Sequence, residues 1–366
     1  MKSNTIARGI LKAIAVFVGV VLLCFFIYKV QSVIAYVVIA GVVALLGRPI
    51  VALLRRKLKF PNTMAVIFTM LVIFGLLLGV LALFIPLLSD QGDNLSFLNM
   101  KDMQNALDKL YNQITGYFGA SPKVVDKLME GGELEKNLME ELDMGFVPKF
   151  LNSLFEILSS FGIGLFSVLF ISFFFLKDSK FIQGVLLKII PKPYETKAIN
   201  SIESIKNLLS RYFVGLTFQI LILFVIYSVV LLVVGVENAI VIALLCALFN
   251  IIPYLGPMIG AGVMVLLTMI SFLDQDFSLV ILPNAGYVLL GVVIGQLVDN
   301  FFSQPLIFSH SVKSHPLEIF LVIVIAGLLF GVVGMIVAVP GYTVVKVILK
   351  EFMLDYRWVK AITKGL

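Results

Sequence analysis

The stretch Ala239-IVIALLCALFNIIPYLGPMIGAGVMVLLTM-Ile270 decides the fold, because it is predominantly apolar and contains no charged residue. It is longer than the roughly 20 residues with which an α-helix crosses the hydrocarbon core of a bilayer. Near its middle, Pro253 and Pro257 remove backbone donors and interrupt the helix. We therefore predict that 238–273 forms a broken helical hairpin, which enters and leaves the membrane on one side.

The composition indicates a membrane protein. The chain is 60% hydrophobic and 14% charged, whereas about 25% of the residues of a soluble domain are charged. We predict an all-α polytopic membrane protein with about eight membrane-embedded segments, six of them full spans and two of them broken, re-entrant hairpins. The expected full spans are 10–28, 32–54, 63–88, 152–176, 212–235 and 278–298, and the expected hairpins are 238–273 and 316–350.

The second expected hairpin is interrupted in the same way as the first. Glycines break 316–350 at Phe330-Gly-Val-Val-Gly334, and Pro340 with Gly341 follows. Two interrupted segments in corresponding positions of two halves are the sequence sign of an inverted repeat around a binding site at the bilayer midplane. The alternative is that these residues are only the prolines and glycines common in membrane helices.

Positive charge predicts the orientation. Basic residues gather in 48–59, in 177–211 and in the tail 351–366, and such loops face the cytoplasm. We therefore expect both termini in the cytoplasm. A single crossing by each of 238–273 and 316–350 satisfies the same charges, but their length favours hairpins. The chain has a net charge of +6, and its positive excess lies in these loops, so we expect contact with membrane lipids and no nucleic-acid partner.

The pattern of apolar and charged segments suggests five regions. We expect spans one to three in 1–89, an extracytoplasmic helical subdomain in 90–151, and a fourth span with amphipathic helices at the cytoplasmic surface in 152–211. The transport core occupies 212–350, and a basic cytoplasmic tail occupies 351–366. The 90–151 segment is expected to be a helical connector, with a role in assembly or as a lid left open.

Signatures of enzymes are missing from the sequence. The chain has two histidines, His310 and His315, and contains no HExxH zinc motif, P-loop or nucleophile elbow. Its two cysteines, Cys24 and Cys246, both lie within apolar runs. We therefore expect no catalytic residue, no cofactor and no structural metal site.

The first candidate site is the break in the 238–273 segment. Unwound backbone inside a membrane is tolerated only where protein or a water-filled cavity surrounds it, and its carbonyls and new helix N-terminus then offer ligands. Asn250 and Tyr254 would add side-chain hydrogen bonds beside Pro253, Gly256 and Pro257. The alternative is a purely structural kink. Gly331 and Gly334 mark the corresponding break in the second hairpin.

The second candidate site follows the span at 278–298. Gln296, Asp299 and Asn300 are spaced to share one helical face, and Gln304 comes soon after. A carboxylate near lipid is unfavourable, so it is treated as functional by default. Asp299 could take up a proton or sodium, with Gln296 and Asn300 as neutral ligands. The alternative is a solvated aspartate at the membrane boundary.

At these motifs the sequence resembles the AI-2E transporter family of bacterial inner-membrane proteins. The residues that carry the resemblance are Asn250–Pro257, Val298–Phe301 with Gln304–Leu306, His315–Pro316, and Phe330–Met335 with Ala338–Pro340. The resemblance implies a multi-pass inner-membrane transporter that forms a homo-oligomer.

The resemblance also implies two activities, and the residues leave a third possibility. The leading hypothesis is a secondary transporter that exports a small polar solute such as the quorum-sensing signal autoinducer-2. The first alternative is a sodium(lithium)/proton antiporter, for which Asp299 is the candidate titratable group. The second is a non-transporting scaffold that holds partners through 90–150.

Overall fold

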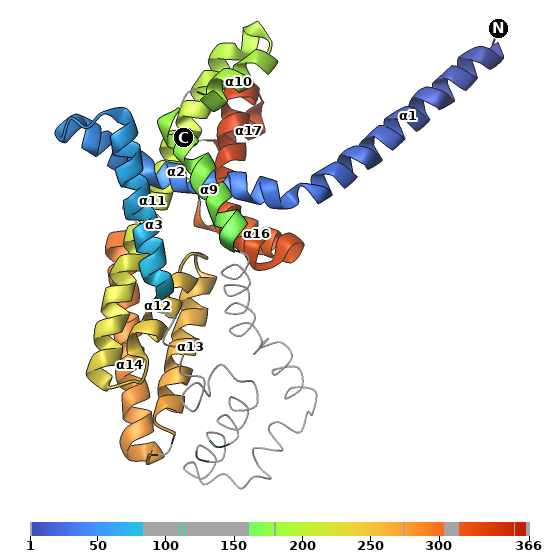
Figure 1. The fold of residues 1–366 in the computed structure, drawn as a ribbon. Coiled ribbons are helices and arrows are strands. Elements are labelled where there is room, and N and C mark those ends of the chain that lie inside the picture. The colour runs from blue at the N-terminus through green and yellow to red at the C-terminus, as the bar shows by residue number, and fades with distance from the viewer. Residues whose placement is uncertain are drawn as a thin grey trace. The chain divides into compact units, whose positions relative to one another are not determined.

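The computed structural model describes residues 2–82, 109, 113, 161–178, 181–273, 275–303, 315–354 and 356–363. Among these residues the regular structure is helical and there is no strand, which confirms the predicted all-α fold (Figure 1). The expected 90–151 subdomain lies outside the described residues except for Lys109 and Gln113. The chain divides into two compact units, Met1–Leu71 with Ser159–Ile182, and Val72–Leu158 with Gln183–Leu366.

The first unit is a small group of apolar helices. It holds α1 (Lys2–Lys29), α2 (Gln31–Lys57), the first part of α3 (Asn62–Ala82) and α9 (Phe161–Lys177). A Cβ at Gly47 would lie 3.1 Å from a methyl of Leu176, so the missing side chain lets α2 and α9 pack closely. At the end of α9, the Asn62 amide donates to the Lys177 carbonyl at 3.1 Å.

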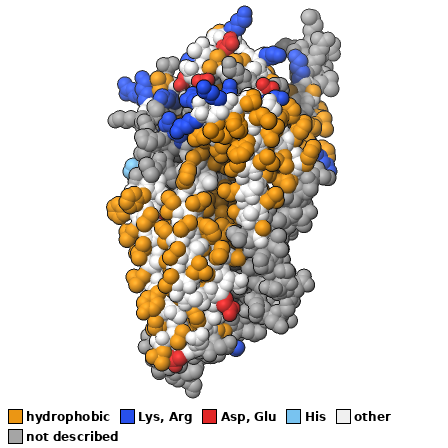
Figure 2. Space-filling view, turned by 60° about the vertical axis from the view of Figure 1, so that its left-hand side comes forward, with side chains coloured by type: hydrophobic (Ala, Val, Ile, Leu, Met, Phe, Trp, Pro, Cys, Tyr) orange, Lys and Arg blue, Asp and Glu red, His pale blue; other side chains and the backbone are white. Residues whose placement is uncertain are grey.

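Several helices have the length and composition of membrane spans. Within the described part of the chain, five are long and apolar enough to cross a bilayer, and they cover Gln31–Lys57, Asn62–Val80, Lys192–Val234, Phe277–Ser303 and Pro316–Met353. Shorter apolar helices cover Lys12–Phe26, Gly164–Lys177, Ala239–Phe249 and Leu255–Ser271. Large hydrophobic side chains remain exposed on these helices, among them Phe166, Val233 and Leu328. Figure 2 shows hydrophobic side chains over much of the described surface in view, as lipid contact requires.

The second unit is organised along one long helix, α11 (Glu195–Val234). The amphipathic pattern expected over 179–210 is divided between α10 (Phe181–Ile189), the 3-10 turn η2 (Lys192–Tyr194) and the first part of α11. The helix then continues without a break into the expected span at 212–235. Its start and end have local causes: Pro191 and Pro193 precede it, and Gly235 ends it with φ 81°.

The 238–273 segment forms a hairpin of two helices, α12 (Ala239–Phe249) and α13 (Leu255–Ser271). At its open end, the Glu237 amide donates to Ser271 Oγ at 3.1 Å, although 34 residues separate the two. Between the arms, a Cβ at Gly260 would lie 3.1 Å from the Cys246 carbonyl. The predicted hairpin geometry is confirmed, while its entry and exit on one side of a membrane stays a prediction.

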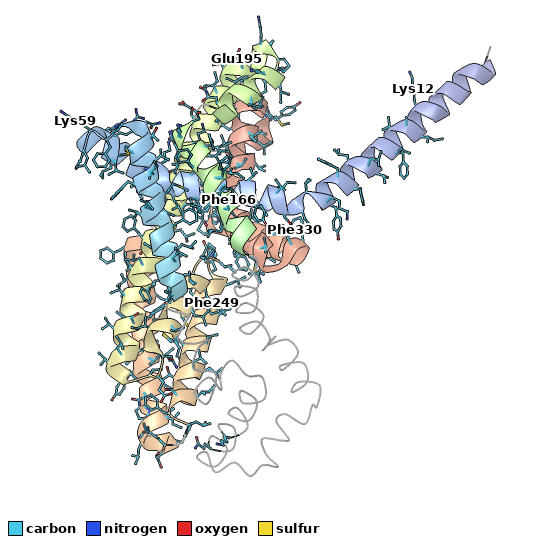
Figure 3. The ribbon with its side chains drawn as sticks, in the orientation of Figure 1. Lys12, Lys59, Phe166, Glu195, Phe249 and Phe330 are labelled. Atoms are coloured by element: carbon cyan, nitrogen blue, oxygen red, sulfur yellow. The ribbon has the colours of Figure 1, made fainter. Side chains whose placement is uncertain are left out.

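The 316–350 segment also turns back on itself, within α16 (Pro316–Met353). The turn is Gly331, with φ 63° and ψ −149°, a backbone conformation that is accessible to glycine. Tyr342 then donates its hydroxyl to Glu318 Oε2 at 2.9 Å. A continuous helix would separate positions 24 residues apart by about 36 Å, so this contact requires a hairpin. Figure 3 labels Phe330, the last residue before the turn.

The two hairpins approach α11 from opposite ends. The Tyr194 ring, next to the start of α11, lies 6.2 Å from the Phe352 ring at the open end of the second hairpin. The open end of the first hairpin, Val236 and Ala239, packs in one core with Leu231 near the end of α11. This opposite arrangement agrees with the inverted repeat expected from the two interrupted segments.

The tip of the first hairpin reaches the arms of the second. Ile252 shares a core with Ile319, Ile323 and Tyr212. The Tyr254 ring meets the Phe320 ring edge-on at 6.2 Å. The two broken segments are therefore packed against each other.

The remaining long helix, α14 (Leu282–Val298), lies between two π-helical turns, η3 (Phe277–Ile281) and η4 (Asp299–Ser303). It packs against α11, where Cβ atoms at Gly291 and Gly295 would crowd Val230 and Tyr227. Gly291 meets Val230, whereas Gly295, later in α14, meets Tyr227, earlier in α11. The two helices are therefore antiparallel. Helix α17 (Arg357–Ile362) follows α16.

We expect Gly256→Ala to destabilise the first hairpin by about 1–3 kcal/mol, the usual penalty of overpacking. The added Cβ would overlap the Phe249 carbonyl across the tip, and backbone cannot rotate away as a side chain can. The measurement is the midpoint of thermal unfolding in detergent. Gly262→Ala on the same helix is the control, since, apart from the neighbouring backbone of its own helix, no heavy atom of the described residues lies within 4 Å of its Cβ. Equal midpoints for the two variants would contradict the close contact at the tip.

We expect cysteines replacing Glu318 and Lys346 to be joined by a bismaleimide of about 10 Å, because a continuous helix would hold them about 42 Å apart. In the structure Lys346 Nζ lies 3.6 Å from Glu318 Oε2. The experiment uses a background without Cys24 and Cys246, and mass spectrometry detects the linked peptides. The control pair places the second cysteine at Val333, next to the turn. Linkage of the control pair but not of the 318–346 pair would exclude the hairpin.

Candidate functional site

A carboxylate is completely buried where α14 ends against α11. Asp299 is 0% exposed, and its Oδ2 accepts a hydrogen bond from Gln219 Nε2 at 2.9 Å. Gln219 is itself 7% exposed. The antiparallel packing of the two helices through Gly291 and Gly295 brings these residues together. We call Gln219 and Asp299 the aspartate pair.

A second polar group connects α11, α14 and the first hairpin. Gln296 Nε2 donates to the Tyr227 hydroxyl at 2.9 Å and lies 3.5 Å from Asn250 Oδ1. Asn250 in turn donates its Nδ2 to the Cys246 carbonyl at 3.1 Å. Asn250 is 2% exposed, at the start of the break between α12 and α13. We call Tyr227, Gln296 and Asn250 the amide chain.

The aspartate pair and the amide chain are neighbours along α11. Gln219 and Tyr227 are eight residues apart, which corresponds to about 12 Å along a helix, and Gln296 precedes Asp299 by one helical turn on α14. Both groups are therefore layers of one polar region inside otherwise apolar helices. Polar residues inside membrane helices face the protein interior and mark solute or ion pathways.

The turn that carries Asp299 is π-helical. In η4 (Asp299–Ser303) the first and last residues are buried, while Asn300, Phe301 and Phe302 are exposed. Single π-helical turns inside α-helices occur frequently at functional sites. The wide turn keeps Asp299 and Ser303 on the side that faces α11. Asn300, predicted as a neutral ligand, is exposed in this turn.

The structure separates the predicted site residues into two groups. Asn250, Gln296 and Asp299 belong to the buried polar region. Apart from Asn300, which is exposed in η4, the others that are described surround the two turns of the hairpins, where Tyr254 is 39% exposed with φ 67°, Gly256 allows the close contact, and Gly334 approaches the Ala326 carbonyl. Pro253, Pro257 and Gly331 make the breaks. Gln304 lies outside the described residues.

Three residues of the polar region were missed in the sequence. They are Gln219, Tyr227 and Ser303, of which Ser303 is 5% exposed. The signal for the first two is that they are polar residues in the apolar span 212–235, an arrangement that is unfavourable unless they have partners. Their spacing of eight residues places them on similar faces of α11. Their partners come from α14, whose register against α11 the sequence does not specify.

The second hairpin carries an ion pair of its own. Lys346 is 3% exposed and lies 3.6 Å from Glu318, which also accepts the hydroxyl of Tyr342. This contact joins the two arms near their open end. Lys346 also lies over the ring of Tyr342, 5.6 Å from its centroid. We assign the pair a structural role, because it satisfies a nearly buried lysine.

The buried region offers oxygen ligands but few charged ones. Among the described residues, no group of three or more histidines, cysteines and carboxylates could hold a metal ion. A single carboxylate with neutral amides and hydroxyls suits a proton, a monovalent cation or a small polar solute. It is a poor ligand set for a transition metal, which prefers imidazole or thiolate.

Three similar proteins have names that refer to transport. "Putative transport protein YueF" of Bacillus subtilis (strain 168) is 27% identical over 324 residues, 88% of this chain and 84% of that protein. "Putative transport protein YrrI" of the same organism is 30% identical over 184 residues, half of each chain. "Putative transport protein MJ1177" of Methanocaldococcus jannaschii is 22% identical over 191 residues, 52% of this chain and 54% of that protein.

A family model agrees with these relatives. Residues 14–353 match the model described as AI-2E family transporter. The match includes both hairpins, the aspartate pair and the amide chain, and it extends beyond the motifs in the second half that suggested the family. The chain is therefore an integral membrane protein of the AI-2E transporter family, and it is a membrane transporter.

Proposed function

We propose that this chain is an ion-coupled secondary transporter, in which Asp299 takes up the coupling ion. The supporting observation is the complete burial of the Asp299 carboxylate between membrane helices, hydrogen-bonded to Gln219. A buried carboxylate is unfavourable in such surroundings and is retained where it carries charge or protons. We place the protein in the bacterial inner membrane as a homo-oligomer, with both termini in the cytoplasm.

Exchange of sodium or lithium for protons is the function that this geometry supports best. An antiporter needs one group that binds either a proton or an alkali cation, but never both at once. A single buried carboxylate meets that need. The Gln219 amide holds the carboxylate without supplying a positive charge that would compete with a cation. The turn η4, which continues α14, carries Asp299, and the first hairpin meets α14 through Gln296 and Asn250. Movement of either element would therefore alter access to the carboxylate.

Export of a small polar solute such as autoinducer-2 is the second candidate, and the amide chain favours it. Its phenol and two amides offer both donors and acceptors without charge, which suits a neutral polyhydroxylated ligand. Through Asn250, the amide chain also reaches the tip of the first hairpin. Inverted-repeat transporters bind their substrates at such broken segments. Proton uptake at Asp299 would then supply the driving force for export.

We expect Asp299→Asn to reduce sodium-driven proton flux to the level of empty liposomes, because an amide neither binds a proton nor carries a charge. The assay imposes a sodium gradient on proteoliposomes and follows an internal pH dye. Asp276→Asn is the matched control, since Asp276 lies outside the spans and caps η3 through Ser278 and Leu279. Asparagine caps helices about as well as aspartate does. Backbone hydrogen bonding from Leu279 lowers the pKa of Asp276, so the control also removes a negative charge.

Flux in Asp299→Asn equal to that of the control would remove Asp299 from the coupling role. Absence of sodium-driven flux in the wild-type protein, with normal insertion, would exclude the antiport arm. Export of a small polar solute would then be tested directly.

If the chain exports a small polar solute, we expect Tyr227→Phe to raise the KM for autoinducer-2 about fivefold. This corresponds to the loss of one hydrogen bond of about 1 kcal/mol. Uptake into inside-out vesicles measures it. The variant removes the hydroxyl that orients Gln296 and leaves the ring. Tyr287→Phe on α14 is the control, because Tyr287 is 61% exposed. Equal KM values for the two variants would exclude the amide chain as the solute site.

A further inference from the structure

The hydroxyl of Ser303 is buried without a hydrogen-bond partner among the described residues. The residue as a whole is 5% exposed. A buried polar atom left without a partner destabilises a protein by about 1–3 kcal/mol. Such an atom calls for an explanation, and a bound ion is one of the established ones.

Ser303 lies on the same face as Asp299. The two residues are the ends of η4, and both are buried while the three residues between them are exposed. A π-helical turn closes a hydrogen bond from i to i+5, so residues four apart are nearly aligned. The burial pattern shows the same alignment independently of the ideal geometry. The hydroxyl and the carboxylate therefore face one interior region beside α11.

The chemistry of this region matches an alkali cation. We propose that Asp299 and Ser303 form a binding site for sodium or lithium, with the carboxylate and the hydroxyl as ligands and Gln219 as the residue that positions the carboxylate. The inference rests on the proposed function and deepens it, because it adds Ser303 as a ligand of the coupling ion. Hard cations take oxygen ligands. One carboxylate balances the charge of a monovalent ion, whereas divalent ions in proteins are held by several oxygen ligands with more negative charge.

Ser303 distinguishes this site from one that binds only a proton. Protonation of Asp299 needs no second oxygen ligand, so the loss of the Ser303 hydroxyl would not remove a ligand from a proton site. An alkali cation would be contacted by both oxygens and would satisfy the buried hydroxyl. Ser303 is therefore the residue that sets the choice of ion, and Asp299 is the residue that carries the charge.

Binding is tested without transport, by the thermal stability of the full chain in detergent. Sodium or lithium chloride is titrated against choline chloride at constant ionic strength, since a ligand of the native state raises the unfolding midpoint. We expect the wild-type midpoint to rise with sodium or lithium. In Ser303→Ala the same rise should need at least about tenfold more cation, the equivalent of one ligand interaction of about 1.4 kcal/mol. Asp299→Asn should show no rise.

Three further variants make the result specific. Ser303→Thr keeps the hydroxyl and should titrate like the wild type, whereas Ser303→Cys keeps the size and should titrate like Ser303→Ala, because sulfur is a soft ligand. Ser228→Ala is the matched control, as Ser228 Oγ on α11 is also buried without a partner among the described residues. It lies about 13 Å along the helix from Gln219. This control should titrate like the wild type.

Two outcomes would overturn the inference. One is a wild-type protein that neither sodium nor lithium stabilises, and the other is a Ser303→Ala variant that titrates like the wild type. Neither outcome decides the proposed function, which is tested by flux in Asp299→Asn. Flux that depends on Asp299 together with an unchanged Ser303→Ala titration would keep the coupling role and discard the serine ligand.

Discussion

The close contact between α11 and α14 determines where the only fully buried carboxylate of the described residues lies. Gly291 and Gly295 leave no side chain between the helices, where Cβ atoms would crowd Val230 and Tyr227. Without hydrophobic attraction between helices in lipid, such small residues are what allows tight packing. One turn further, the same register places Asp299 against Gln219. A larger residue at either glycine would separate the aspartate from the amide that holds it.

Glycines also allow the close packing at the turns of the two hairpins. Backbone that leaves the helix inside a membrane must find partners within the protein. At the first break, Asn250 fills this need by donating to the Cys246 carbonyl, and Gly256 brings α13 against the last carbonyl of α12. At the second break, Gly331 reverses the chain in a single residue. The breaks are thus sealed by packing, and the polar region meets the first break at Asn250.

The hairpins could be predicted because their signals are local. Proline, glycine and an apolar length too great for one crossing are all readable along 238–273 and 316–350. Asp299 was also readable, as a carboxylate that ends an apolar span. The identity of its partner was not, because Gln219 is 80 positions away and helix register depends on how Gly291 and Gly295 fit α11. Ser303 was missed because its burial depends on how η4 packs against α11, and the sequence does not specify that packing. The continuous α11 was missed because a change from amphipathic to apolar character need not break a helix.

The balance of charges in the polar region bears on how transport could be coupled. The aspartate pair contains one ionisable group and one neutral amide, and the amide chain beside it contains none that is charged at neutral pH. A change at Asp299 therefore alters the net charge of the region by one unit, which is a large change where the dielectric constant is low. The amide chain connects that change to the first hairpin through Gln296 and Asn250. Since Ile252 at the hairpin tip packs against Ile319 and Ile323 of the second hairpin, a change of charge at Asp299 has a continuous path of contacts to both hairpins.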